Sequence, residues 1–152
     1  MLTAVPTHWY SQDFTLRDGD RTLAELDFSS WRERGVLTID GRDYRVYREG
    51  AMSGAFILEL DGTEIARAEK PSAFHRMFIV RHAGQEWELS AASALRRKFV
   101  LLQGSNEVGV IAPEHAFSRR AAVDLRVTLP PAVQAFIVWL TLLLWKRERN
   151  SG

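Results

Sequence analysis

The 152-residue sequence contains no cysteine, which removes several kinds of protein chemistry at once. Disulfides, thiol nucleophiles and cysteine-ligated zinc or iron–sulfur centres all need a thiol, so the chain can form none of them. Small secreted domains often depend on disulfides, so this absence favours a reducing compartment, and we expect a cytoplasmic protein. Residues 1–14 also lack the basic start and apolar core of a signal peptide, and we expect none there.

The sequence also lacks an excess of charge of either sign. Its 20 Lys and Arg residues are balanced by 19 Asp and Glu residues, and the net charge is +1 at pH 7. Proteins that bind nucleic acid usually carry a clear basic excess, so we expect no nucleic-acid partner. With 46% hydrophobic residues, the composition is that of one globular domain. Lysine is scarce beside arginine, which indicates a GC-rich bacterial genome.

Known catalytic and metal-binding motifs are missing as well. The four histidines show neither the i, i+4 spacing nor the neighbouring carboxylates of a zinc site. Residues 50–54 place Ser53 one position too late for a nucleophile elbow. The glycines are spread along the chain rather than gathered into a phosphate-binding loop. We therefore predict no metal, no cofactor and no catalytic residue.

Turn signals recur about every 20 residues, which is the regularity of a hairpin meander. A small residue or aspartate stands beside glycine in each, and Asp-Gly between apolar runs is typical of a tight hairpin turn. Five such turns are centred on Gly19, Gly41, Gly62, Gly84 and Gly104.

The segments between these turns have the composition of short strands. They are rich in β-branched and aromatic residues, as in 36–39, 44–47, 55–60, 64–68, 77–82, 86–90, 99–103 and 108–112. Apolar and polar residues alternate most regularly over 121–127, which predicts one buried and one solvated face. The pattern predicts roughly ten to twelve antiparallel strands.

The segment after Pro130 and Pro131 differs from everything before it. Between residues 132 and 145 only Gln134 and Thr141 are polar, so a helix here is apolar on every side. Such a helix is buried either in a protein core or in a membrane. A bilayer span needs about 20 apolar residues, so this run of fourteen favours a core helix. A short tail anchor is the alternative.

We therefore predict a mainly β fold: a closed antiparallel barrel of about twelve strands around a buried hydrophobic C-terminal helix. Residues 1–152 form a single domain, with the strand meander at about 14–127 and the helix at about 131–147. Closure supplies the cover that the helix needs and removes sheet edges that would otherwise aggregate.

The order of these features resembles the tubby C-terminal-like superfamily, which includes the tubby domain, the phospholipid scramblases and the LURP-one-related proteins. The glycine-turn hairpins from Gly19 to Gly104, the strand at 108–111, the strand at 121–127 and the helix after Leu129 carry the resemblance. It implies a twelve-stranded barrel around a central hydrophobic helix, and tubby domains bind phosphoinositide headgroups through basic side chains. Neither those basic residues nor the acidic calcium segment of scramblases has a matched position in this sequence.

Two basic clusters are the candidate binding residues. They are Arg96, Arg97 and Lys98 before one predicted strand, and Arg119 and Arg120 before the last. If the fold brings them together, five cations could meet anionic phospholipid headgroups at a membrane surface; solvated arginines paired with surface acids are the simpler alternative. The leading hypothesis is a non-enzymatic binding module. A tail-anchored scramblase-like membrane protein and an enzyme with a cleft at the barrel mouth are the other two.

Overall fold

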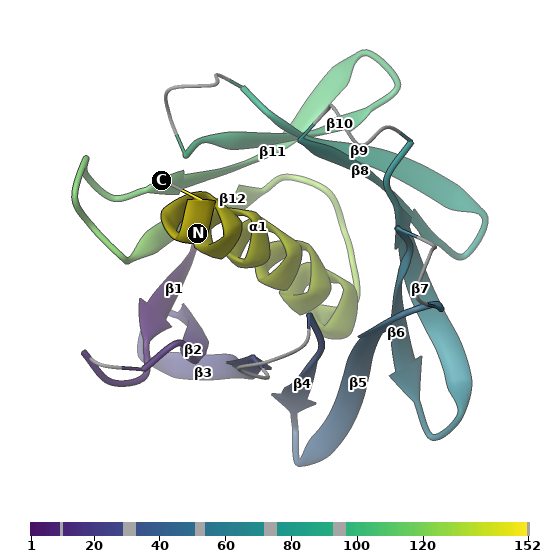
Figure 1. Ribbon diagram of the computed structural model, residues 1–152, viewed down its shortest axis with the longest axis horizontal. Coiled ribbons are helices and arrows are strands. Elements are labelled where there is room, and N and C mark those ends of the chain that lie inside the picture. The colour runs from purple at the N-terminus through teal and green to yellow at the C-terminus, as the bar shows by residue number, and fades with distance from the viewer. Residues whose placement is uncertain (10, 29–32, 51–53, 72–75, 93–96, 152) are drawn as a thin grey trace.

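The predicted fold class is confirmed. The computed structural model describes residues 1–9, 11–28, 33–50, 54–71, 76–92 and 97–151. These residues form a closed antiparallel barrel in which each strand pairs with its neighbours in sequence (Figure 1). The circuit closes where β1 (Leu2–Pro6) pairs with β12 (Ala121–Leu125), through Leu2 to Val123 and Ala4 to Ala121.

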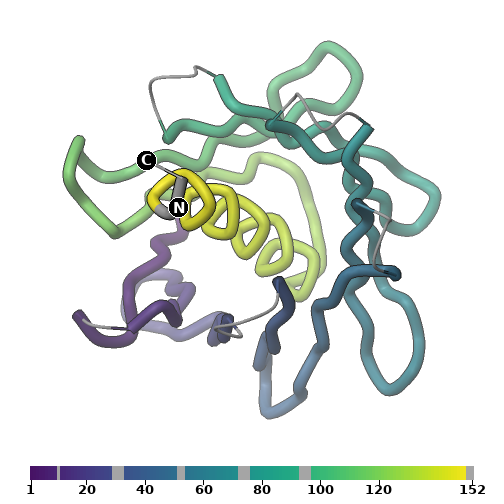
Figure 2. The backbone as a smooth tube through the Cα atoms, in the orientation of Figure 1, coloured from purple at the N-terminus to yellow at the C-terminus, as the bar shows by residue number. Residues whose placement is uncertain are grey.

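The barrel surrounds a single helix, α1 (Pro131–Ser151), which crosses its interior (Figure 2). The remaining strands are β2 (Phe14–Asp18), β3 (Arg21–Phe28), β4 (Gly35–Ile39), β5 (Arg42–Arg48), β6 (Phe56–Leu60), β7 (Thr63–Glu69), β8 (Met77–His82), β9 (Gln85–Ala91), β10 (Phe99–Gln103) and β11 (Asn106–Pro113).

Connections at the two ends of the barrel differ in length. Five two-residue turns, at 19–20, 40–41, 61–62, 83–84 and 104–105, form what we call the turn mouth. At Asp40-Gly41 and Asp61-Gly62 both central residues have positive φ, the geometry of the tight hairpin turns predicted for these positions. Six connections of six or seven residues, at 7–13, 29–34, 49–55, 70–76, 92–98 and 114–120, form the opposite end, the loop mouth.

Neighbouring hairpins are joined mainly near the loop mouth. β7 and β8, for example, pair only from Arg67 to Glu69 with Ile79 to Arg81, although each strand continues toward its turn. The hairpin turns consequently point outward from the helix (Figure 1). α1 begins after the segment 126–130 at the turn mouth and ends at the loop mouth.

The core is built on α1, whose apolar residues are buried on every side as predicted. From Val133 to Leu140 all apolar side chains of the helix have 0% exposure. The two polar exceptions are satisfied locally: the Thr141 hydroxyl donates to the Ile137 carbonyl at 3.0 Å, and the Gln134 amide donates to the Leu129 carbonyl at 2.7 Å. No helix in the described part of the chain is long and apolar enough to cross a membrane.

Trp139 is the closest link between the helix and the wall. Its ring stacks on Phe28 with a centroid distance of 5.0 Å and meets Phe56 edge-on at 5.7 Å. Its indole N–H donates to the Asp27 carbonyl at 3.2 Å. Gly35, opposite Phe28 in the β3–β4 pair, leaves room for this contact, because a Cβ there would lie 2.7 Å from the indole nitrogen.

Two predicted boundaries were wrong. The meander begins at Leu2 rather than near residue 14, because β1 is a strand of its own that completes the barrel. Only Ala4 of β1 is fully buried and Pro6 ends it, and its five residues show no regular alternation of apolar and polar side chains. The helix also continues four residues beyond the predicted end, as a polar last turn outside the apolar run.

Truncation after Pro130 should abolish folding of the whole barrel. The deletion removes ten large buried apolar side chains, and burial of each contributes about 1.5–3 kcal/mol, whereas the net stability of a domain is about 5–15 kcal/mol. Circular dichroism and size-exclusion chromatography measure the result. A truncated protein that stays monomeric and unfolds cooperatively would show that the barrel does not need the helix.

Replacing Gly35 by alanine should lower the free energy of unfolding by about 1–3 kcal/mol, because the added methyl group collides with the Asp27 carbonyl and the Trp139 indole. Gly54→Ala is the matched control, since its Cβ would meet only Lys70 at an ordinary 3.5 Å. Urea unfolding followed by tryptophan fluorescence compares the two. Equal stability of both variants would contradict the tight approach at Gly35.

Candidate anion-binding site at the loop mouth

Charge is distributed unevenly between the two ends of the barrel, although the whole chain is nearly neutral. The described residues of the loop-mouth connections, together with the last turns of α1 from Lys146, include ten Lys or Arg residues and five Asp or Glu residues. The turns of the turn mouth contain Asp20, Asp40 and Asp61 and no Lys or Arg. The barrel therefore has a clear basic excess at the end where the helix terminates and none at the turn mouth.

Three arginines from distant parts of the sequence converge at this basic end. Arg97 precedes β10, Arg119 precedes β12, and Arg149 lies in the last turn of α1. They line one pocket that is open to solvent on one side, and its cavity of about 10 Å³ has room for about one water molecule. Its remaining walls are apolar, from Phe14, Leu142 and Trp145. The carbonyl end of a helix favours positive charge, which suits these arginines to their place beside the end of α1.

Arg97 and Arg119 hold the surrounding loops by hydrogen bonds to backbone carbonyls. Arg97 donates to the carbonyls of Ala116 and Ser118 at 3.2 and 2.8 Å, and its guanidinium lies 4.8 Å from the centre of the Trp145 ring. Arg119 donates to the carbonyl of Trp9 at 2.6 Å and to that of Ser11. Both arginines thus have structural contacts and add positive charge to the pocket.

The pocket has no internal negative charge to balance them. Within the described ranges, Arg97, Arg119 and Arg149 form no ion pair with a carboxylate. Desolvation, and then repulsion by Arg119 and Arg97, lowers the pKa of the Arg149 guanidinium. Two buried donors at the pocket, the indole N–H of Trp145 and the Nε of Arg119, have no hydrogen-bond acceptor in the described part of the chain. An anion at the open side of the pocket would relieve the repulsion among the three arginines.

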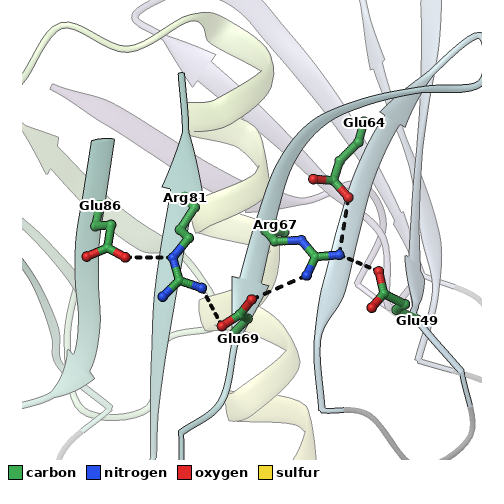
Figure 3. A network of polar contacts seen from close by, with 6 residues as sticks. All are labelled: Glu49, Glu64, Arg67, Glu69, Arg81 and Glu86. Carbon is green, nitrogen blue, oxygen red and sulfur yellow. Dashed lines mark hydrogen bonds and ion pairs between the residues drawn. The ribbon is translucent and has the colours of Figure 1, made fainter. Parts of the chain in front are cut away.

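Arginines on the outer wall of the barrel are arranged quite differently. Arg67 binds three carboxylates and Arg81 binds two, in one network across β7, β8 and β9 (Figure 3). The shared member, Glu69, has its pKa lowered by hydrogen bonds from Arg81 and Arg67, against a smaller opposing effect of burial. Each guanidinium there is neutralised by its neighbours, whereas the three at the pocket are not.

A second cluster at the loop mouth is also compensated. Glu33 receives two hydrogen bonds from Arg147 in α1 and lies 3.5 Å from Arg48. Burial alone would raise the pKa of the Glu33 carboxyl, but Arg147, with Arg48 and Lys70, outweighs burial and holds the pKa below its usual range. This ion pair ties the end of the helix to the barrel.

The structure brings together only part of the predicted site. Arg97 and Arg119 line the same pocket. Lys98 and Arg120 are exposed instead, and Arg120 forms an ion pair with Glu114 at 3.4 Å. Because side chains alternate along extended chain, each cluster is divided between the inside and the outside of the barrel. Arg96 lies outside the described residues.

Arg149 was missed, although its sequence position contains a usable signal. It stands four residues after Trp145, which places both on one face of the helix.

Comparison of the chain with protein-family models, with curated proteins and with solved structures gives no match. The resemblance to the tubby C-terminal-like superfamily accordingly stays a prediction.

Glu33→Gln should lower the free energy of unfolding at neutral pH by about 1 kcal/mol, because it removes the charge that binds Arg147. The folded state lowers the pKa of Glu33, so the stabilisation is present above the unfolded value, about 4.3, and is lost as pH falls through the folded value. The difference in free energy of unfolding between the variant and the native protein, measured by urea unfolding, should therefore disappear at acid pH.

Glu107→Gln is the control for this experiment. Its ion pair with Arg126, at 3.2 Å, is about half exposed on both sides, so the change should be close to zero at every pH. A loss of the same size in both variants would contradict a specific role for Glu33.

Proposed function

We propose that this protein is a non-enzymatic module that binds anionic phospholipid headgroups at a membrane surface through its loop mouth. The observation that carries the proposal is the convergence of Arg97, Arg119 and Arg149 without a balancing carboxylate. Guanidinium groups are planar, permanently charged and suited to two-point contact with phosphate oxygens. A phosphate group therefore suits the charge and the donor chemistry at the open side of the pocket, although the cavity itself is too small to enclose it.

Exposed cations beside the pocket support a surface rather than a single small ligand. Lys98 and Arg120 are exposed next to it, Arg120 in an ion pair with Glu114, and Lys146 lies on the same end of α1. Each basic residue near an anionic membrane contributes about 1 kcal/mol of binding free energy. Several weak contacts of this kind add up on a lipid surface.

Binding chemistry fits the pocket better than catalysis. Its walls are arginines and apolar side chains, and none of these groups changes its protonation state near neutral pH. General acid–base catalysis needs groups that exchange protons in that range. The lipid partner also accords with what the resemblance to tubby domains implies, and we place the module on the cytoplasmic face of a bacterial membrane.

Vesicle sedimentation at low salt tests the proposal. The triple variant Lys98→Ser, Arg120→Ser, Arg149→Ser should bind vesicles containing phosphatidylglycerol about a hundredfold more weakly than the native protein, from about 1 kcal/mol per removed charge. These residues were chosen because Arg97 and Arg119 also hold loops in place. Native binding should weaken steeply as salt is added, because exposed charges are screened.

The matched control removes three arginines near the turn mouth: Arg21→Ser, Arg42→Ser, Arg126→Ser. It lowers the net charge by the same amount and should leave binding within about threefold of native. Equal losses in the two triple variants, or a native protein that never binds these vesicles, would refute the proposal.

A further inference from the structure

Two aromatic side chains at the loop mouth are almost fully exposed to solvent. Trp9 is 86% exposed and Phe117 is 95% exposed, whereas the large aromatics of the barrel interior, such as Trp87 and Phe99, are at most 1% exposed. Scattered single apolar residues on a surface need no explanation. These two, however, lie on adjacent loops beside the same cationic pocket.

The arginines of the pocket hold both aromatic loops. Arg119 binds the carbonyl of Trp9 itself, and Arg97 binds the carbonyls on either side of Phe117. The strands that border these loops, β1 and β12, are paired through Ala4 and Ala121. Positive charge and exposed aromatic surface are therefore parts of one surface.

The loops 7–13 and 114–120 share one pattern of backbone hydrogen bonds. This pattern holds the backbone from which Trp9 and Phe117 project. In both, the first N–H donates to the carbonyl six residues later: Thr7 to Asp13 at 2.9 Å, and Glu114 to Arg120 at 3.0 Å. The fifth residue of each is a serine, whose N–H donates to the carbonyl of the histidine at the second position.

Each serine hydroxyl also accepts the last N–H of its loop, at 2.9 Å in both. The two sequences share the histidine and the serine, and an aromatic residue precedes each serine, Tyr10 in one loop and Phe117 in the other, whereas Trp9 corresponds to Ala116. The aromatic residues therefore project from closed, hydrogen-bonded loops.

The remaining connections of this mouth have a related composition. One large apolar residue stands near the middle of each in the sequence, at Trp31, Met52, Phe74 and Leu95, all of which lie outside the described residues. The turns of the turn mouth contain no large apolar residue. In the sequence, each of the six longer connections thus contains a large apolar residue and none of the five tight turns does.

From these observations we infer that Trp9 and Phe117 insert into the interfacial region of a bilayer, so that the barrel stands on the membrane on its loop mouth. The inference rests on the proposed function and adds the orientation and the anchoring residues. Tryptophan and other aromatic side chains favour the membrane–water interface, and neighbouring cations favour its anionic headgroups. On a surface that binds only soluble anions, the two aromatic side chains would stay in water and would contribute no favourable binding free energy.

Fluorescence quenching by brominated lipid measures the insertion directly. Vesicles of phosphatidylglycerol and brominated phosphatidylcholine should quench the native protein, and Trp9→Phe should lose a large part of that quenching. Trp87, Trp139 and Trp145 contribute little, because each is at most 4% exposed, and every protein in this comparison carries Trp31→Phe, because Trp31 also stands in a loop-mouth connection. Adding Phe117→Trp to the Trp9→Phe variant should restore quenching from the second loop.

Affinity gives an independent readout. Trp9→Ala and Phe117→Ala should each weaken vesicle binding about tenfold, as expected for withdrawing one large apolar side chain from the interface. Thermal unfolding of both should match native, because the removed side chains are exposed. Trp9→Phe is the conservative control and should bind like native protein.

Other outcomes separate this inference from the function on which it rests. Native-like binding of both alanine variants, with no quenching, would overturn insertion and leave electrostatic docking intact. Full competition by soluble polyglutamate, again without quenching, would assign the surface to an acidic protein and also overturn insertion. Unchanged binding of the triple variant at Lys98, Arg120 and Arg149 would instead remove the proposed function itself.

Discussion

The enclosure of α1 is the constraint on which the rest of this structure depends. A helix with apolar residues on every side can be stable in water only if something surrounds it, and a closed barrel does so without leaving a sheet edge. The same enclosure determines where the ends of the helix lie. Because α1 enters at the turn mouth, its polar last turn must leave at the loop mouth, where Arg147 meets Glu33 and Arg149 meets Arg97 and Arg119.

The functional surface follows from the alternation of long and short connections. In a barrel of sequential antiparallel strands, every second connection lies at the same end, so the tight turns gather at one mouth and the longer loops at the other. Loops that tolerate variation commonly hold binding residues above a rigid scaffold. Here the C-terminal end of α1 lies at the same mouth as the longer loops, and this is also where unbalanced positive charge lies.

The sequence predicted those parts of the fold that depend on neighbouring residues alone, such as tight turns and the apolar helix. Asp40-Gly41 indicated a turn because few residue pairs accept positive φ at both positions, and the run from Ala132 to Trp145 indicated a core helix by length and composition. β1 was missed because its own sequence is weakly patterned and its role in closing the barrel depends on β12, more than a hundred residues away. The site was half predicted for a similar reason: residues 97 and 119 could be listed, but their meeting with Arg149 depends on the path of the helix.

The order of elements along the chain has a consequence for biosynthesis. All twelve strands leave the ribosome before the helix that fills them, so the nascent sheet has its inward apolar faces without a core until α1 emerges. Exposed apolar faces and unpaired strands are the species that aggregate during folding and that chaperones bind. The barrel therefore acquires its packed core only after α1 has been synthesised, and until then the inward faces of the strands are prone to aggregation.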